Sequence, residues 1–273
     1  MRARKRFGQH FLEPAWVAKL VTAIDARPDE AVLEIGPGRG AITLPLASRA
    51  GRLLAIEIDR DLAAALEARA LPRVTVVTGD FLDLDIPAVV ETWLGAPLGP
   101  ESAVRVVGNL PYNVSSPILF RLLELAATTG GLRDAVLMLQ AEVADRLIAA
   151  VGTAEYGVLT ILTGLGAETE RLLALPPGAF RPAPKVRSAV VRLRFRPPPV
   201  PIADPALLVA MVRSMFTQRR KTLLNALKPF AADLGCETSE ALSNAGIAPI
   251  RRPETLQLVE IARLADTFAA VRR

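Results

Sequence analysis

The sequence is poor in the residues that build disulfides and most metal sites. Its 273 residues include one cysteine, Cys236, and one histidine, His10. A single cysteine excludes an internal disulfide and any cysteine-cluster metal site, and a single histidine excludes a multi-histidine site. A Ser-His-Asp triad would have to use His10. These absences remove most hydrolase and metalloenzyme classes, and we expect no bound metal.

Long apolar runs are also missing. Although 51% of the residues are apolar, enough for a full core, no run reaches the ~18 residues of a membrane span. The basic segment 2–6 leads into Phe-Gly-Gln-His rather than into an apolar signal core. We therefore expect a protein without a secretion signal or membrane contact, located in the cytoplasm.

The net charge of +5 is unevenly distributed. Residues 1–12 carry four basic and no acidic side chains, and residues 181–196 carry six and none. Residues 13–180 hold 13 basic against 21 acidic side chains, and residues 201–273 hold ten against seven. Basic ends around an acidic body are typical of a polyanion-binding surface beside a separate active site. Solvated charge on loops is the alternative interpretation.

Short apolar runs alternate with helical patterns over the first 200 residues. The expected strands are residues 31–35, 53–56, 74–77, 104–107, 135–139, 170–175 and 188–195. The expected helices are residues 13–26, 41–49, 61–70, 86–94, 115–127, 141–151 and 157–165. This alternation predicts an α/β, Rossmann-like fold with a doubly wound, mostly parallel sheet. Ligands of such sheets bind at the carboxyl ends of the strands, where the strand order reverses.

A proline-rich segment, residues 196–201, predicts an extended linker. Beyond it the pattern is only helical, with helices expected at residues 205–216, 219–227, 239–245 and 253–271. We therefore expect two domains: residues 1–200, with a basic N-terminal arm, and a small all-helical domain at residues 201–273.

A glycine-rich loop follows the first expected strand with the spacing Glu34-x-Gly36-x-Gly38-x-Gly40. Glycines let the backbone turn tightly and let a nucleotide approach closely. The spacing differs from the dinucleotide-binding G-x-G-x-x-G. The second strand ends at Glu57, an acid placed where ribose hydroxyls are held in such folds. We prefer Glu57 to Asp59 because Glu57 stands at the strand end itself.

The third strand ends in Gly79-Asp80-Phe81. A carboxylate there can accept a hydrogen bond from an adenine amino group, and Phe81 can pack on the ring. A helix-capping role for Asp80 is the alternative.

The fourth strand stops at Gly108 and is followed by Asn109-Leu110-Pro111-Tyr112. Pro111 cannot continue a strand ladder and pushes Leu110 into an extended conformation. The Leu110 carbonyl and the Asn109 side-chain carbonyl are then two fixed acceptors beside the Tyr112 ring. Such a set suits a planar exocyclic amine on a base that stacks on the tyrosine. An ordinary strand end with a proline turn is the alternative.

Six segments in order carry a family resemblance: 7–12, 34–40, 57–59, 79–80, 109–113 and 180–188. The glycine loop resembles motif I of S-adenosylmethionine (SAM) methyltransferases, and the whole set resembles the ribosomal RNA adenine N6-dimethyltransferases. Residues 218–223 and 252–254 resemble the bacterial small-subunit (16S) branch of that family. The resemblance runs from about residue 4 to residue 265.

The resemblance implies roles for individual residues. The SAM site would be lined by His10, Leu12, Gly36, Gly38, Glu57, Asp80, Phe81 and Asn109. The catalytic set would be Asn109, Leu110, Pro111, Tyr112 and Phe180, with the target adenine held between the two rings. The expected RNA-binding residues are the basic ones at Arg4, Lys5, Arg6, Lys185, Arg219, Arg220, Lys221, Arg251 and Arg252.

The implied substrate is two adjacent adenines in the terminal hairpin of small-subunit rRNA, each methylated twice. We expect the protein to be a monomer. Two residues depart from the common family pattern: His10 stands where asparagine is frequent, and Arg187 where an acid is common. Three alternatives stay open. They are a large-subunit (23S) rRNA adenine methyltransferase, a DNA adenine methyltransferase, and a non-catalytic ribosome-assembly or transcription factor on the same fold.

Overall fold

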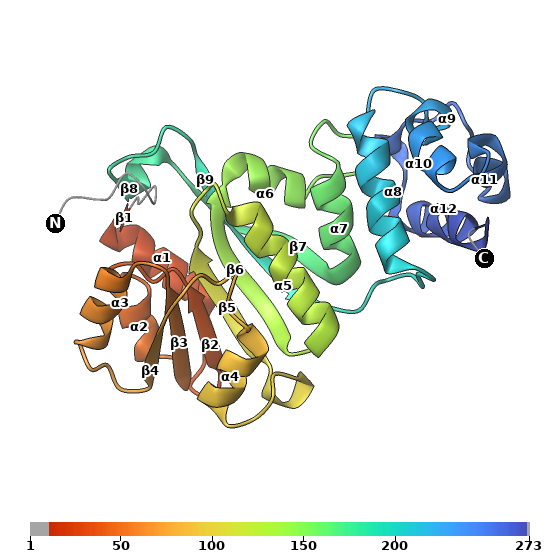
Figure 1. Ribbon diagram of the computed structural model, residues 1–273. Helices are drawn as coiled ribbons and strands as arrows, with labels where there is room; N and C mark the ends of the chain where they lie inside the picture. Colours follow the sequence, from red (N-terminus) through yellow and green to blue (C-terminus); the bar gives the residue numbers. More distant parts are fainter. Residues whose placement is uncertain (1–10, 272–273) are drawn as a thin grey trace. The chain divides into compact units, whose positions relative to one another are not determined.

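The computed structural model describes residues 11–271, which divide into two compact units (Figure 1). The first unit ends at residue 144 and resumes for residues 168–196, and the second comprises residues 145–167 and the described residues from 197 onward. The chain passes from the first unit to the second for the last time between residues 196 and 197, close to the expected boundary at residue 200. Segment 145–167 belongs to the second unit although it precedes the linker, because a local helical pattern carries no information about which unit a helix packs in.

A seven-stranded sheet forms the centre of the first unit, in the order β4-β3-β2-β5-β6-β9-β7. Five neighbouring strands pair in parallel, and β9 pairs antiparallel to β6. The strands are β2 (Ala31–Ile35), β3 (Arg52–Glu57), β4 (Val74–Thr78), β5 (Val104–Asn109), β6 (Leu132–Gln140), β7 (Ala167–Leu175) and β9 (Ser188–Phe195). The predicted seven-stranded, mostly parallel sheet is confirmed.

Three helices of the first unit begin at a capping acid or a proline. Asp59 and Asp85 accept hydrogen bonds from the first amides of α3 and α4, and Pro14 opens α1. The elements are α1 (Pro14–Ile24), α2 (Thr43–Ala47), α3 (Arg60–Glu67), α4 (Ile86–Leu94), η2 (Pro100–Ser102), α5 (Ser115–Thr129), η3 (Pro177–Ala179) and the start of α6 (Ala141–Leu147).

Both faces of the sheet are buried, as a doubly wound fold requires. On one face, Val32, Leu53 and Val107 pack in a single cluster with Leu20 of α1 and Leu46 of α2. The residues that alternate with them are also buried, at 0% exposure for Leu33, Leu54, Val106 and Leu137. The sheet therefore rests on a rigid core that fixes the positions of its strand ends.

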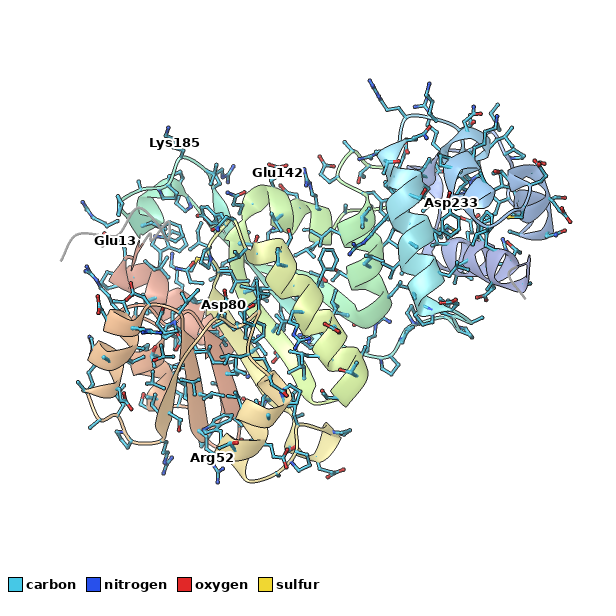
Figure 2. All side chains as sticks on the ribbon, in the orientation of Figure 1. Glu13, Arg52, Asp80, Glu142, Lys185 and Asp233 are labelled. Atoms are coloured by element: carbon cyan, nitrogen blue, oxygen red, sulfur yellow. The ribbon has the colours of Figure 1, made fainter. Side chains whose placement is uncertain are left out.

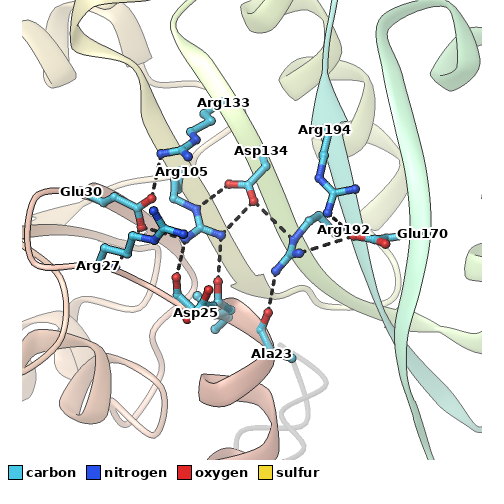
Figure 3. Close-up of polar contacts among 11 residues, drawn as sticks. Ala23, Asp25, Arg27, Glu30, Arg105, Arg133, Asp134, Glu170, Arg192 and Arg194 are labelled. Carbon is cyan, nitrogen blue, oxygen red and sulfur yellow. Dashed lines mark hydrogen bonds and ion pairs between the residues drawn. The ribbon is translucent and has the colours of Figure 1, made fainter.

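A buried ion-pair network joins the end of α1 to the sheet (Figure 3). Arg105 of β5 lies between Glu30 and Asp134, at 2.8 and 2.7 Å, and also donates to the carbonyls of Ile24 and Asp25. Burial alone would lower the pKa of Arg105, but hydrogen bonds to Asp134 and Glu30 outweigh it and raise that pKa above its ordinary value. The guanidinium therefore stays charged and holds three elements together.

The second unit is all-helical, as predicted for the C-terminal region. Its described elements, with the end of α6, are α7 (Val158–Gly166), α8 (Pro205–Thr217), α9 (Leu223–Ala226), α10 (Lys228–Asp233), α11 (Thr238–Asn244), η4 (Pro253–Thr255) and α12 (Leu258–Val271). Phe230 and Phe268 meet edge to face with ring centroids 5.2 Å apart. The buried Tyr156 donates to the Leu256 carbonyl at 2.7 Å. These contacts give the unit its own core.

The predicted helix over residues 219–227 is wrong in its first turn. Residues 218–220 form a turn, Lys221 lies in a bend, and α9 starts only at Leu223. The amides of Leu223 and Leu224 donate to the carbonyls of Arg251 and Pro249. These long-range bonds fix where the helix begins, and no local pattern encodes them.

Two very short strands were not predicted. They are β1 (Phe11–Leu12) and β8 (Phe180–Arg181), which pair antiparallel in a separate sheet. Two residues offer too little pattern for a strand assignment. None of the described helices is both long and apolar enough to cross a membrane.

Candidate active site

The glycine loop and the Asn-Leu-Pro-Tyr segment meet at one edge of the sheet. The strands that precede them, β2 and β5, are neighbours, and Ile35 pairs with Gly108 in their register. A Cβ on Gly108 would lie 3.1 Å from the Ile35 carbonyl oxygen, a tight contact that glycine avoids. The two motifs therefore begin side by side, at the point where the strand order reverses.

The glycine loop is shaped by its backbone conformation. Gly36 and Gly38 have φ values of +68° and +58°, where side chains are strained, and a Cβ on either would contact nothing within 4 Å. The open side of the loop is compatible with a ligand lying against the backbone. The loop is closed by hydrogen bonds of 2.9 Å from the Gly36 amide to the Ile56 carbonyl and from the Gly40 amide to the Pro37 carbonyl.

Glu57 joins the glycine loop to the next strand end. Its carboxylate accepts from the Gly38 amide at 2.8 Å and from the Asp59 amide at 2.9 Å, while the residue is only 4% exposed. Asp59 instead caps α3, accepting from the amides of Asp61 and Leu62. The two acids therefore have different positions, and the Glu57 carboxylate is the one that touches the loop.

Glu34 lies beneath the loop, on β2, with 1% exposure. Its Oε2 has no hydrogen-bond partner among the residues that the structure describes. Burial is the main cause that raises the pKa of Glu34 to about 7, and the nearby charge of Glu57 adds to it. The first acid of the motif is thus a buried group that can be protonated near neutral pH.

Asp80 and Phe81 follow β4, the next strand beyond β3. Asp80 Oδ1 accepts from the Leu82 amide at 2.9 Å, which shapes the turn, whereas Asp85 caps α4. The second Asp80 oxygen has no bond to the described part of the chain and can accept from a ligand. Phe81 is 3% exposed and therefore packs within the protein.

Asn109 is the last residue of β5, partly buried, and its carboxamide bonds to no residue in 11–271. The Leu110 amide donates to the Met138 carbonyl at 3.2 Å, which extends the strand pairing to this residue. The hydroxyls of Tyr112 and Ser188 lie 2.7 Å apart. The structure therefore places a carboxamide, a fixed backbone segment and an aromatic ring in sequence at one strand end.

Phe180 is placed by the small sheet of β1 and β8. It pairs with Leu12, and both belong to the main hydrophobic cluster, at 3% and 8% exposure. The Arg181 guanidinium donates to Glu13 at 2.6 Å. The Phe180 ring is covered in this structure, so its predicted stacking on a base requires that the ring be uncovered.

The expected RNA-binding residues of the second unit fall into two groups. Arg219 donates to the carbonyls of Thr153 and Ala154, and Arg251 makes a two-pronged pair with Glu260. The side chains of Arg220, Lys221 and Arg252 are exposed and bond to nothing in the described part of the chain. Only the second group presents unpaired charge to a polyanion.

In the first unit, Lys185 extends away from the ribbon in the loop between β8 and β9 (Figure 2). Arg187 is exposed in the same loop, and its carbonyl accepts from the Ala141 amide at 2.9 Å. Arg4, Lys5, Arg6 and His10 lie outside the described residues. Within residues 11–271, no group of three or more His, Cys, Asp and Glu side chains could hold a metal ion.

The sheet topology is that of a Rossmann-like methyltransferase. A family model described as "Ribosomal RNA adenine dimethylase" matches residues 1–269. The chain belongs to the ribosomal RNA adenine dimethylase family.

Several relatives support this assignment over nearly the whole chain. The proteins named "Ribosomal RNA small subunit methyltransferase A" from Aromatoleum aromaticum and Acinetobacter baylyi are 45% and 43% identical to it. The first match covers 98% of this chain and 95% of the relative, and the second 97% and 92%.

Two solved structures share the fold over both units. A dimethyladenosine transferase from Plasmodium falciparum has a TM-score of 0.76 at 23% identity, covering 96% of this chain and 98% of that one. A structure titled "23S rRNA methyltransferase ErmE" has a TM-score of 0.66 at 27% identity, covering 95% and 99%.

Proposed function

We propose that the protein transfers methyl groups from SAM to the exocyclic nitrogens of two adjacent adenines in the 3′-terminal hairpin of small-subunit (16S) rRNA. Each adenine receives two methyl groups during ribosome assembly in the cytoplasm, and the enzyme acts as a monomer. The observation that carries the proposal is the pairing of Ile35 with Gly108, which brings the glycine loop beside Asn109. The full-length similarity to relatives named for small-subunit rRNA supports the choice of substrate.

The residues at the sheet edge suit SAM. The open faces of Gly36 and Gly38 leave room for the cofactor against the backbone. Glu57 would accept from the ribose hydroxyls, and Asp80 from the adenine amino group, with its second oxygen. Leu12, Phe81 and His10 would contribute to the same site. When bound, SAM supplies an electrophilic methyl group, so the protein has only to present the nucleophile.

The Asn-Leu-Pro-Tyr segment would prepare that nucleophile. The exocyclic nitrogen of adenine is a poor nucleophile because its lone pair is delocalised into the ring. The Asn109 side-chain oxygen and the Leu110 carbonyl would accept hydrogen bonds from its N–H groups and turn the lone pair out of the ring plane. The nitrogen would release one proton for each methyl group that it gains, and S-adenosylhomocysteine would be the other product. Pro111 keeps the Leu110 carbonyl in a fixed direction. Proximity and alignment can contribute ~7–11 kcal/mol to such a step.

The target base has to leave its stack to reach these acceptors. Stacking on the Tyr112 ring, and on Phe180 once that ring is uncovered, would offset the cost at ~1–3 kcal/mol per base. Basic residues at 4–6, Lys185, and the exposed cations of the second unit would hold the RNA backbone. We propose the region beyond residue 200 as the RNA-binding domain, and the region before it as the catalytic domain.

The test is incubation of the protein with SAM and with immature small or large ribosomal subunits, followed by mass mapping of the methylated adenines. We expect two adjacent dimethylated adenines in the small subunit. The Asn109→Ala variant should bind RNA like the parent and methylate far more slowly at saturating SAM. Methylation of the large subunit instead would favour a large-subunit (23S) rRNA adenine methyltransferase. No methylation of either subunit would favour a non-catalytic assembly factor.

A further inference from the structure

Ser188, the first residue of β9, is a polar residue in an apolar strand. It is 1% exposed, and the residues that follow it are Ala189, Val190 and Val191. Among the described residues, the Tyr112 hydroxyl at 2.7 Å is the one side-chain partner of the Ser188 hydroxyl. A buried hydroxyl without a partner is destabilising, so the contact with Tyr112 explains a serine at this place.

The Ser188 oxygen is a rigid anchor. Ser188 pairs with Gln140 at the end of the antiparallel ladder of β6 and β9. One residue beyond this pair, the Ala141 amide donates to the Arg187 carbonyl at 2.9 Å. Because β6 also pairs with β5, the strand that carries Asn109, the anchor is fixed relative to the proposed amine acceptors.

Tyr112 lies in a turn and is held at its two ends. Its carbonyl accepts from the Ser115 hydroxyl at 3.2 Å, and its phenol bonds to Ser188. The phenol oxygen lies on the long axis of the ring, so the second bond fixes the direction of that axis. The bond therefore restrains χ1 and favours the staggered position in which the half-buried ring reaches Ser188.

We propose that Ser188 is a positioning residue for methyl transfer: through its hydrogen bond it holds the Tyr112 ring where the target base stacks in register with Asn109 and Leu110. Ser188 acts through Tyr112 and does not touch the substrate. This inference rests on the proposed function. It predicts that removing either hydroxyl has the same consequence, because both belong to one bond.

The experiment is single-turnover methylation of small-subunit RNA, with RNA and SAM saturating, by Ser188→Ala, Tyr112→Phe and the double variant. Each single variant should be slower by about tenfold, and the double variant no slower than either one, since the same bond is lost. The dissociation constants for SAM and RNA should stay parental. Tyr112→Phe keeps the ring and leaves β9 intact, so it tests the bond even if Ser188→Ala is poorly folded.

Two further variants complete the design. Ser188→Thr keeps the hydroxyl and should retain most of the parental rate. Ser48→Ala removes a surface hydroxyl that donates to the Pro45 carbonyl, and it should be indistinguishable from the parent. A parental rate for Tyr112→Phe, or losses that multiply in the double variant, would overturn the inference while the parent still methylates RNA. A parent without activity would overturn the proposed function itself.

Discussion

At the scale of single residues, the structure gives different contacts to charged residues that look alike in the sequence. Glu57 and Asp59 are two residues apart, yet one contacts the glycine loop and the other caps a helix. Arg219 and Arg220 are adjacent, yet one is bound to backbone carbonyls and the other is exposed. In each pair the direction of the side chain decides the role.

Glu57→Ala should weaken SAM binding roughly ten- to a hundred-fold, because hydrogen bonds to a charged acceptor contribute about 1.5–3 kcal/mol. The variant also loses the acceptor that holds the Gly38 amide. Isothermal titration calorimetry with SAM measures the change. Asp59→Ala is the matched control: it should lower the stability of the fold by about 1 kcal/mol through its lost cap and leave SAM affinity unchanged. An unchanged dissociation constant for Glu57→Ala would move the ribose contact elsewhere.

Glu34→Gln should change the pH dependence of stability. Burial raises the pKa of folded Glu34 from 4.5 to about 7. As pH rises from 4.5 to about 7, Glu34 loses its proton in the unfolded chain before it does so in the folded protein. Its contribution to the free energy of unfolding therefore falls over this interval, and the loss is complete above pH ~7. The variant does not undergo this loss. Relative to the parent it should gain about 3 kcal/mol between about pH 4 and about pH 8, as measured by urea unfolding. A difference that stays constant with pH would contradict this.

At the scale of elements, the two ends of β5 have different roles. β2 and β5 pair so that the glycine loop and Asn109 start at the same level. At the opposite end of β5, Arg105 fixes the end of α1 through the carbonyls of Ile24 and Asp25. One strand therefore carries the proposed chemistry at its carboxyl end and a structural ion-pair network at its start.

Arg105→Ala should destabilise the protein by about 3–5 kcal/mol, because it leaves Glu30 and Asp134 as buried charges without this partner. The Arg133→Ala variant is the control. Arg133 also pairs with Glu30 at 2.8 Å, but its side chain is 59% exposed, so its loss should cost less than about 1 kcal/mol. Urea unfolding of both variants at neutral pH makes the comparison. Equal losses would show that the pairs at Arg105 are not the ones that stabilise the fold.

At the scale of the whole molecule, the charge is net positive and unevenly distributed along the sequence. The chain carries a net charge of +5, and its excess of basic residues lies near both ends of the sequence. In the second unit the exposed side chains of Arg220, Lys221 and Arg252 supply charge that pairs with no side chain in residues 11–271. Arg219 and Arg251 bond within their own unit, and we expect those bonds to stabilise it.

Replacing Arg220, Lys221 and Arg252 together with alanine should weaken RNA binding and reduce the slope of log affinity against log salt by about 2–3, the value for three phosphate contacts. The melting temperature and SAM affinity should stay parental. Fluorescence anisotropy over a range of salt concentrations measures the slope.

Two controls test whether this effect is local. Arg49→Ala with Arg73→Ala removes exposed arginines of the first unit and should leave the slope nearly unchanged. Arg219→Ala should lower the melting temperature, since the Thr153 and Ala154 carbonyls lose their donor. If the triple variant keeps the parental slope, the side chains of Arg220, Lys221 and Arg252 do not contact phosphate and are only a solvated surface.

The sequence by itself determined the order and type of most elements, because hydrophobic periodicity is local and strong over segments such as 31–35, 86–94 and 188–195. It also determined the family, since the motifs occur in order. Only the tertiary structure decided which residues of a motif face the site and which hold the fold. Three features depend on contacts between segments distant in the chain. They are the bond between Tyr112 and Ser188, the pairing of Ile35 with Gly108, and the start of α9. Their geometry depends on packing, which no local pattern contains.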